Sequence, residues 1–240
     1  MSRSINDMAS ELLNINSANN PINYKWDSDI FREITYFEDG HNRLKNAICK
    51  IGYKASIGLA ASLFELIYCR LDGSAEITKE MGQKIKYKIN ATWMAAMDPL
   101  LSEILDYNLD ERNDGNVFGP IWIVLVAIKQ LSNRFVRRSY FIHSPVVGIA
   151  LLAEHIFPNK NLFHEWFSQV LEKSAKMYPC TYTYAEIDRN AEYDCSGESP
   201  MLREFYFGSD DTWSIETVRQ RVREYIKSDG AHNPYLRLRK

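Results

Sequence analysis

The chain has 240 residues, of which 45% are hydrophobic and 25% charged, and its formal net charge is −2 at pH 7. This length and apolar content suffice for a buried core and exclude a wholly disordered chain. The nearly neutral charge argues against a protein that binds nucleic acid over its whole surface. Residues 1–20 lack an apolar signal segment, and the longest apolar run, 121–128, is shorter than a membrane span. The sequence therefore predicts a soluble, cytoplasmic protein with no membrane partner.

Apolar side chains recur every three or four residues along the first hundred residues, a spacing typical of amphipathic helices. The pattern predicts a short helix over 27–38, capped by its first or second residue, and then one long helix over 41–70. Gly52 and Gly58 lie inside that long helix, where each costs about 1 kcal/mol relative to alanine. We interpret them as part of a seam of small residues for close helix packing.

A second long helix is expected from residue 74 until Pro99, which removes a backbone donor and kinks or restarts the helix. A polar loop over 108–116 follows. Pro120 then stands near the start of a helix that is apolar on all sides as far as residue 128. Because no face of this segment is polar, we expect it to be the central buried element.

The remaining elements are two helices, two short strands and one further helix. The helices are predicted over 145–157 and from Asn161, which is expected to act as an N-cap. Alternating or aromatic stretches over 181–184 and 202–207 predict short strands. An amphipathic helix over 214–228 ends the regular structure.

These elements predict a mainly all-α fold, a multi-helix bundle with long antiparallel helices. Residues 1–178 form the bundle in this interpretation. Residues 179–240 form a small, irregular, β-containing segment packed on it within one domain. The four cysteines have no CxxC spacing, which favours reduced thiols over disulfides or a zinc site.

Familiar catalytic signatures are missing from the sequence. It contains no GxxxxGK[ST], GxGxxG or GxSxG motif, so phosphate loops and nucleophile elbows lack support. His164 and Glu165 begin like the zinc-protease motif HExxH, but Ser168 stands where the second histidine ligand is needed. We therefore predict no catalytic residue, no metal and no cofactor, and lean against an enzyme.

Arg138 and His143 have the Arg-x₄-His spacing that resembles the motif of HEPN ribonucleases, which are also all-α. The resemblance implies that the arginine binds the scissile phosphate and that the histidine polarises the 2′-hydroxyl. It covers six residues, and chance supplies about one such spacing in a chain of this composition. Ser144 and Pro145 also place His143 at a helix boundary rather than within a helix. A ribonuclease stays an alternative.

The small net charge hides a segregation of charge along the chain. Residues 180–212 contain eight acidic and two basic residues, with tyrosines interleaved. Exposed acids steer a basic partner, and aromatic side chains serve as interface anchors. We therefore predict a partner-binding surface made of Asp188, Glu192, Asp194, Glu198, Tyr206, Asp210, Asp211 and Trp213.

In size, helical build, lack of catalytic motifs and acidic–aromatic surface, the chain resembles helical immunity proteins of bacterial toxin systems. This resemblance is one of overall organisation and implies an inhibitor that neutralises a cognate, basic toxin domain by stoichiometric binding. Basic clusters at 79–88, 129–138 and 219–227 leave a helical nucleic-acid-binding regulator as a further alternative.

Overall fold

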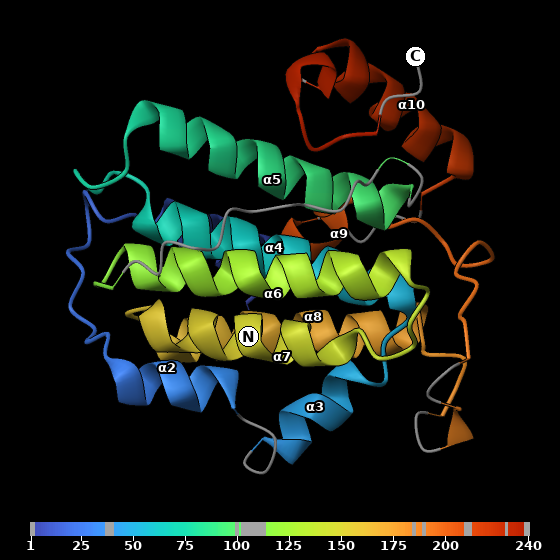
Figure 1. Ribbon diagram of the computed structural model, residues 1–240, viewed down its shortest axis with the longest axis horizontal. Helices are drawn as coiled ribbons and strands as arrows, with labels where there is room; N and C mark the ends of the chain where they lie inside the picture. Colours follow the sequence, from blue (N-terminus) through green and yellow to red (C-terminus); the bar gives the residue numbers. More distant parts are fainter. Residues whose placement is uncertain are drawn as a thin grey trace.

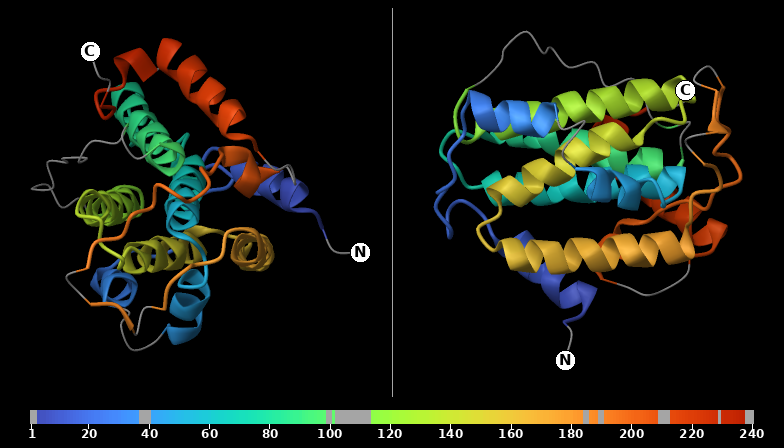
Figure 2. Two further views of the ribbon diagram at one scale, coloured as in Figure 1. Left: turned by 90° about the vertical axis from the view of Figure 1, so that its right-hand side faces the viewer. Right: turned by 90° about the horizontal axis from the view of Figure 1, so that it is seen from below.

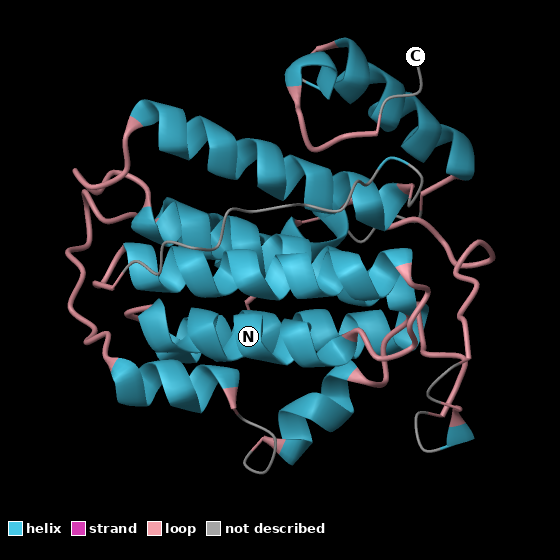
Figure 3. Ribbon diagram, viewed as in Figure 1, coloured by secondary structure: helices cyan, strands magenta, loops and turns pink. Residues whose placement is uncertain are grey.

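The protein is described by a computed structural model that covers residues 3–36, 41–98, 101, 114–183, 186–188, 191–208, 213–228 and 230–237. Within these ranges the chain forms ten α-helices and no β-sheet, which confirms the predicted all-α class (Figure 3). The helices are α1 (Ile5–Asn14), α2 (Ser28–Thr35), α3 (Asn42–Ile48), α4 (Tyr53–Leu71), α5 (Lys79–Met97), α6 (Phe118–Val136), α7 (His143–Ile156), α8 (Lys160–Met177), α9 (Arg203–Phe207) and α10 (Ile215–Lys227), followed by the short 3-10 helix η3 (Gly230–His232). Every helix in the described ranges is too short or too polar to traverse a lipid bilayer.

The bundle is built around α4, which lies side by side with α5, α6 and α7 and also contacts α1 and α9 (Figures 1 and 2). Of its 19 residues, 17 are buried, whereas only 10 of the 19 residues of α6 are buried. The prediction that the apolar helix after Pro120 is the central element was therefore wrong. Small residues, including Gly58 and Ala60, let neighbours approach α4 from several sides.

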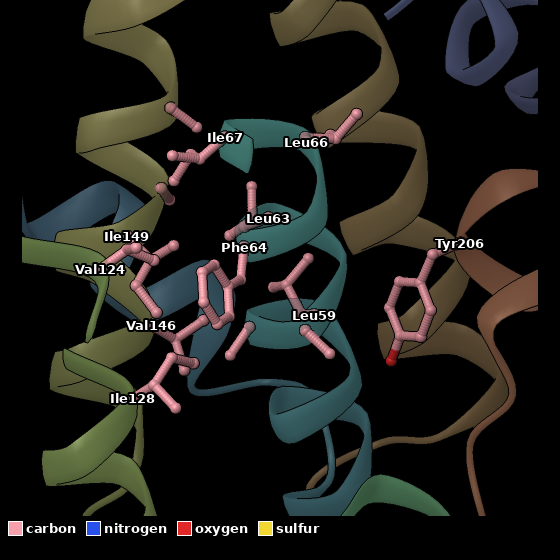
Figure 4. Close-up of a cluster of buried hydrophobic side chains, with 14 of the residues drawn as sticks. Leu59, Leu63, Phe64, Leu66, Ile67, Val124, Ile128, Val146, Ile149 and Tyr206 are labelled. Carbon is pink, nitrogen blue, oxygen red and sulfur yellow. The ribbon is translucent and has the colours of Figure 1, made fainter. Parts of the chain in front are cut away.

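The core continues from one side of α4 to the other (Figure 4). Phe64 of α4 lies next to Val124 of α6 and Val146 of α7 on one side. Tyr206 of α9 occupies the other side, and it belongs to the same cluster of buried side chains. The C-terminal part of the chain thus contributes directly to the core of the bundle.

The predicted long helix over 41–70 is broken into α3 and α4. Gly52 has an extended backbone and stands before the first residue of α4. Its N–H donates a hydrogen bond to the carbonyl oxygen of Tyr178 at 2.7 Å, and Ile51 forms an isolated β-bridge with Pro179. The chain leaves the helix here because the backbone pairs with a distant segment and because glycine is a poor helix former.

Local signals placed some helix ends correctly and others a few residues away. Asp27 caps α2 by accepting hydrogen bonds from the N–H groups of residues 29 and 30, and Ser214 caps α10 as the predicted range implies. The second long helix begins after Thr78 rather than at residue 74, and Asn159 rather than Asn161 caps α8. The predicted loop at 108–116 lies largely outside the described residues.

Three elements differ in kind from the sequence prediction. Residues 202–207, predicted as a strand, contain α9, which is packed against α1 and α4. Of the other predicted strand, residues 181–183 have no strand structure and residue 184 lies outside the described residues. The polar N-terminus contains α1, an unpredicted helix that buries Met8 and Leu12. At α1 and α9, a few buried apolar side chains at helical spacing determine the structure, although the sequence there is polar at α1 and alternating at α9.

Residues 179–208 form a segment that we call the strap; within it, 184–185 and 189–190 lie outside the described residues. The strap runs along one end of the bundle (right-hand side of Figure 1) before α9 returns to the core. Three backbone hydrogen bonds join it to the bundle, from Cys180 to Lys50 at 2.9 Å, Tyr193 to Arg138 at 2.7 Å and Met201 to Ala96 at 3.1 Å. These bonds fix the strap at its beginning, middle and end.

The helix that follows the strap, α10, lies at the edge of the molecule beside α5 and η3 (Figure 2). Val218 is its buried residue, and the side chain of Ile215, expected to be buried, is 62% exposed. Its hydrophobic stripe is therefore only partly covered by the described residues.

Candidate functional site

Three of the predicted docking residues, Asp188, Glu192 and Asp194, belong to the strap and are exposed, and we call these three side chains the outer face of the strap. Asp194 also lines a cavity of about 590 Å³. Asp188 and Asp194 are exposed, and the Glu192 side chain is 69% exposed. Glu192 forms a long ion pair with Arg138, at 3.7 Å between Oε2 and Nη1. The Asp194 carboxylate accepts hydrogen bonds from the backbone and hydroxyl of Ser196, which hold its pKa below the usual range. The outer face therefore presents carboxylates to solvent.

Glu198 turns the other way and caps α4. Its two carboxylate oxygens accept hydrogen bonds from the N–H groups of Tyr53 at 3.1 Å and Lys54 at 2.8 Å, and the Tyr193 hydroxyl donates a further short bond. Because Gly52 offers no capping side chain, this distant carboxylate supplies the anion that a helix N-terminus favours. The contacts of Glu198 within the chain account for its position without a partner.

Tyr206 is fully buried, so the prediction that it belongs to a docking surface was wrong. Its hydroxyl donates a hydrogen bond to the carbonyl oxygen of Ala55 at 2.7 Å. Its ring packs so closely on Gly58 that a Cβ at that position would stand 2.5 Å from the hydroxyl oxygen. Burial raises the pKa of Tyr206 well above its ordinary value. Gly58 thus forms the predicted close-packing seam, with α9 as the element that fills it.

The last three predicted docking residues lie beyond the strap. Asp210 and Asp211 lie outside the described residues. Trp213 is half-buried, and its indole N–H is enclosed without a hydrogen-bond partner among the residues that the structure describes. Of the predicted set, Asp188, Glu192 and Asp194 are thus the members that belong to the strap and are exposed.

A cluster of tyrosine rings fastens the strap to the bundle. Tyr140, Tyr182 and Tyr193 contact one another with ring centroids 4.8–4.9 Å apart, and Tyr53 of α4 joins Tyr193 at 5.1 Å. Aromatic pairs at such distances contribute about 0.5–1.5 kcal/mol each beyond the area they bury. The tyrosines that the sequence suggested as partner anchors are mainly used inside the molecule.

A cavity of about 860 Å³ lies between the start of the strap, α3 and the first residue of α7. Lys45 and Lys50 line it, and none of its described lining residues is acidic. His143, with 5% of its surface exposed, lines it too. Burial, followed by the nearby charges of Lys45 and Arg134, lowers the pKa of His143 to about 4. We call this space the cationic cavity; sequence analysis did not identify it.

Arg138 and His143 do not line a common site. Arg138 lines a separate cavity of about 590 Å³ together with Tyr53 and Tyr193, and its guanidinium pairs with Glu192. His143 lines the cationic cavity as the first residue of α7, which confirms that it stands at a helix boundary. A ribonuclease of the HEPN kind needs both side chains at one phosphate, and within this single chain the two side chains line different cavities.

Many of the basic side chains have partners within the chain. Lys84 pairs with Glu80 at 2.6 Å, and Lys88 lies over a tyrosine ring with its pKa lowered to about 8 by burial. On α10, Arg221 and Arg223 approach Glu204 and Glu216 at 3.6 and 3.3 Å. The ion pairs of Lys84, Arg221 and Arg223 are exposed to solvent and therefore weak, so the nucleic-acid alternative stays a prediction.

In the described ranges, no three His, Cys, Asp or Glu side chains lie close enough together to hold a metal ion. His164, from the incomplete zinc motif, pairs instead with Glu154 at 2.9 Å. The four cysteines are free thiols, and burial raises the pKa of each. Comparisons with protein families, with curated proteins and with solved structures each found no match to this chain. The resemblance to immunity proteins stays one of overall organisation.

Proposed function

We propose that this protein acts by binding another protein, and that the partner is a basic toxin domain which it neutralises in a stoichiometric complex. The observation that carries the proposal is the exposure of three carboxylates of the strap, at Asp188, Glu192 and Asp194. Such charges attract a cationic surface and set specificity and association rate more than raw affinity.

The strap is also suited to binding because it is held in place. The Tyr193 N–H donates to the carbonyl oxygen of Arg138, and the neighbouring Ser139 forms a β-bridge with Glu192. Glu192 and Asp194 therefore flank a backbone position that is fixed to the turn between α6 and α7. A surface that is already ordered loses less conformational entropy on binding, which supports affinity.

The test begins with a partner captured from native lysate and continues with the purified pair. We expect a triple variant, Asp188→Asn, Glu192→Gln and Asp194→Asn, to associate about tenfold more slowly at low salt and to show a flatter salt dependence. The measurement is the association rate constant by stopped-flow fluorescence over a range of salt concentrations. The toxin activity of the partner is titrated in parallel, with complete inhibition expected at equimolar protein.

A matched control removes three carboxylates from other elements, in the variant Glu33→Gln, Glu76→Gln and Glu165→Gln, whose positions are all exposed. It changes the net charge equally, so its association rate shows the effect of total charge alone. Equal rates for the two triple variants would refute the strap as the docking surface. A partner whose activity is unchanged by excess protein would refute the inhibitory function.

A further inference from the structure

The cationic cavity collects positive charge from separate elements of the fold. Lys45 belongs to α3, and Lys50 follows that helix directly. Arg134 of α6 does not line the cavity, but its guanidinium donates a hydrogen bond to the carbonyl oxygen of Phe141, a lining residue, at 2.6 Å. Lys45 and Lys50 come from the same short stretch of chain, whereas Arg134 comes from α6, so its proximity to the two lysines depends on the tertiary fold.

The charge at this place has little compensation from the cavity walls. The described lining residues include no aspartate or glutamate. His143 is buried, and both Lys45 and Arg134 act on its imidazole as positive charges. Lys45 also lines an adjoining cavity of about 240 Å³ together with Arg134 and Ser144. Like charges that lie near one another repel, and an anion placed between them relieves that repulsion.

The walls also contain groups that would suit the rest of a small organic molecule. Phe141, Pro179 and Tyr182 contribute apolar surface, and Asn46 and Thr183 contribute polar side chains near the lysines. The volume of about 860 Å³ lies within the range of about 300–1,000 Å³ that is usual for small-molecule sites.

We propose that this cavity binds a small organic anion, a molecule that carries a phosphate or carboxylate group on an apolar body. Lys45 and Lys50 bind the anionic group, and the aromatic and proline walls contact the body of the ligand. This site is distinct from the acidic outer face of the strap, and it is tested on the purified protein without any protein partner. Its outcome is therefore independent of the proposed inhibition.

The experiment is isothermal titration of the full-length protein with phenyl phosphate, with benzoate and with neutral benzyl alcohol. We expect at least one of the two anions to bind and benzyl alcohol not to bind. The two anions distinguish a phosphate site from a carboxylate site. In the double variant Lys45→Gln and Lys50→Gln, we expect affinity to fall by about tenfold or more, because each lost charged contact removes a strong hydrogen bond.

Two further variants separate charge from structure. Lys45→Arg and Lys50→Arg together keep both charges and should restore most of the binding. Lys79→Gln and Lys227→Gln remove two exposed lysines on α5 and α10 and should leave binding unchanged. Circular dichroism confirms that each variant is folded. Failure of both anions to bind, or equal weakening by the α5 and α10 variant, would overturn the proposal.

The cysteines report where the ligand binds. Cys49 and Cys180 line the cationic cavity, whereas Cys69 and Cys195 do not. We expect a saturating anion to slow the alkylation of Cys49 and Cys180 by N-ethylmaleimide and to leave the other two rates unchanged, as read by mass spectrometry. Protection of Cys69 or Cys195 alone would place the ligand elsewhere and contradict the assignment.

Discussion

The two faces of the strap differ in how they use the same residue types. On the outer face, Asp188 and Asp194 are exposed to solvent. On the inner face, Glu198 caps α4, Tyr193 joins a ring cluster and Tyr206 is fully buried. A sequence segment that is acidic and aromatic throughout is thus sorted by the fold, with most aromatics inward and most described acids outward. Amino-acid composition alone therefore cannot show whether such residues bind a partner or attach the strap to the bundle.

The sorting has a simple energetic basis. Burying an aromatic side chain contributes about 2–3 kcal/mol through the hydrophobic effect, whereas burying a carboxylate is unfavourable unless it is well paired. Glu198 can turn inward because α4 begins at Gly52 without a capping side chain and offers two N–H donors. The comparison between the two faces can be tested by variants on each side.

The largest effect is expected for Glu198→Ala on the inner face. The substitution removes the acceptor of the Tyr53 and Lys54 N–H groups and of the Tyr193 hydroxyl. Hydrogen bonds to charged groups contribute about 1.5–3 kcal/mol each and are not additive, so the free energy of unfolding should fall by about 4 kcal/mol. The measurement is urea unfolding followed by circular dichroism. Glu192→Ala is the matched control on the outer face, and it should unfold at the same urea concentration as the wild type.

The next effect concerns pH and the inner side of the strap. The pKa of His143 is lowered from 6.5 to about 4, so the folded protein binds its proton less readily than the unfolded chain. The contribution of His143 to the free energy of unfolding is therefore fully present above pH 6.5. It is lost as the pH falls towards 4, by about 3 kcal/mol in total. Lys45 and Arg134 face the imidazole, and their positive charges add to the effect of burial on this pKa.

His143→Gln should remove this part of the pH dependence. Because carboxylates elsewhere titrate in both proteins, the informative quantity is the difference between the two stability curves. Thermal unfolding at a series of pH values gives that difference. Parallel curves for His143→Gln and wild type would contradict a buried, neutral His143.

A smaller effect is expected at the contact between α4 and α9. In Gly58→Ala, the new Cβ would stand 2.8 Å from two ring carbons of Tyr206. Overpacking of a buried site costs about 1–3 kcal/mol, and the better helix propensity of alanine returns about 1 kcal/mol. Because the contact is much shorter than van der Waals distance, we expect a cost near the upper end and a net loss of about 2 kcal/mol. Chemical unfolding measures this loss. Adding Tyr206→Leu removes the clashing ring, so Gly58→Ala should cost less in that background. Purely additive effects in the double variant would show that the loss does not come from contact with Tyr206.

Interactions between residues that are close in the sequence could be predicted, whereas interactions between distant residues could not. Asp27 and Ser214 were identifiable as helix starts because a cap bonds to N–H groups two or three residues away. Glu198 was not identifiable as a cap, because it lies 145 residues from Tyr53 along the chain. The break at Gly52 depends on pairing with the segment after α8, so helical periodicity alone could not reveal it.

The cationic cavity could not be predicted for the same reason. Lys45, His143 and Tyr182 come from α3, α7 and the strap, and each is unremarkable in its own stretch of sequence. The exposed acids were easier to anticipate, because a run of charged residues in an irregular segment seldom becomes buried. The signal for exposure is local, whereas the signal for a cavity exists only in the fold.

The smallest effect on stability, and the clearest separation of the two faces, is expected for the outer triple variant Asp188→Asn, Glu192→Gln and Asp194→Asn. Exposed charges in water contribute little to folding, and the pair between Glu192 and Arg138 is long and solvated. Differential scanning calorimetry should therefore give the same melting temperature for this variant and the wild type, while association with the partner slows. A clear loss of stability would mean that these carboxylates fasten the strap as Glu198 does. The outer face would then be structural, and the acidic partner-binding surface would have to be sought elsewhere on the molecule.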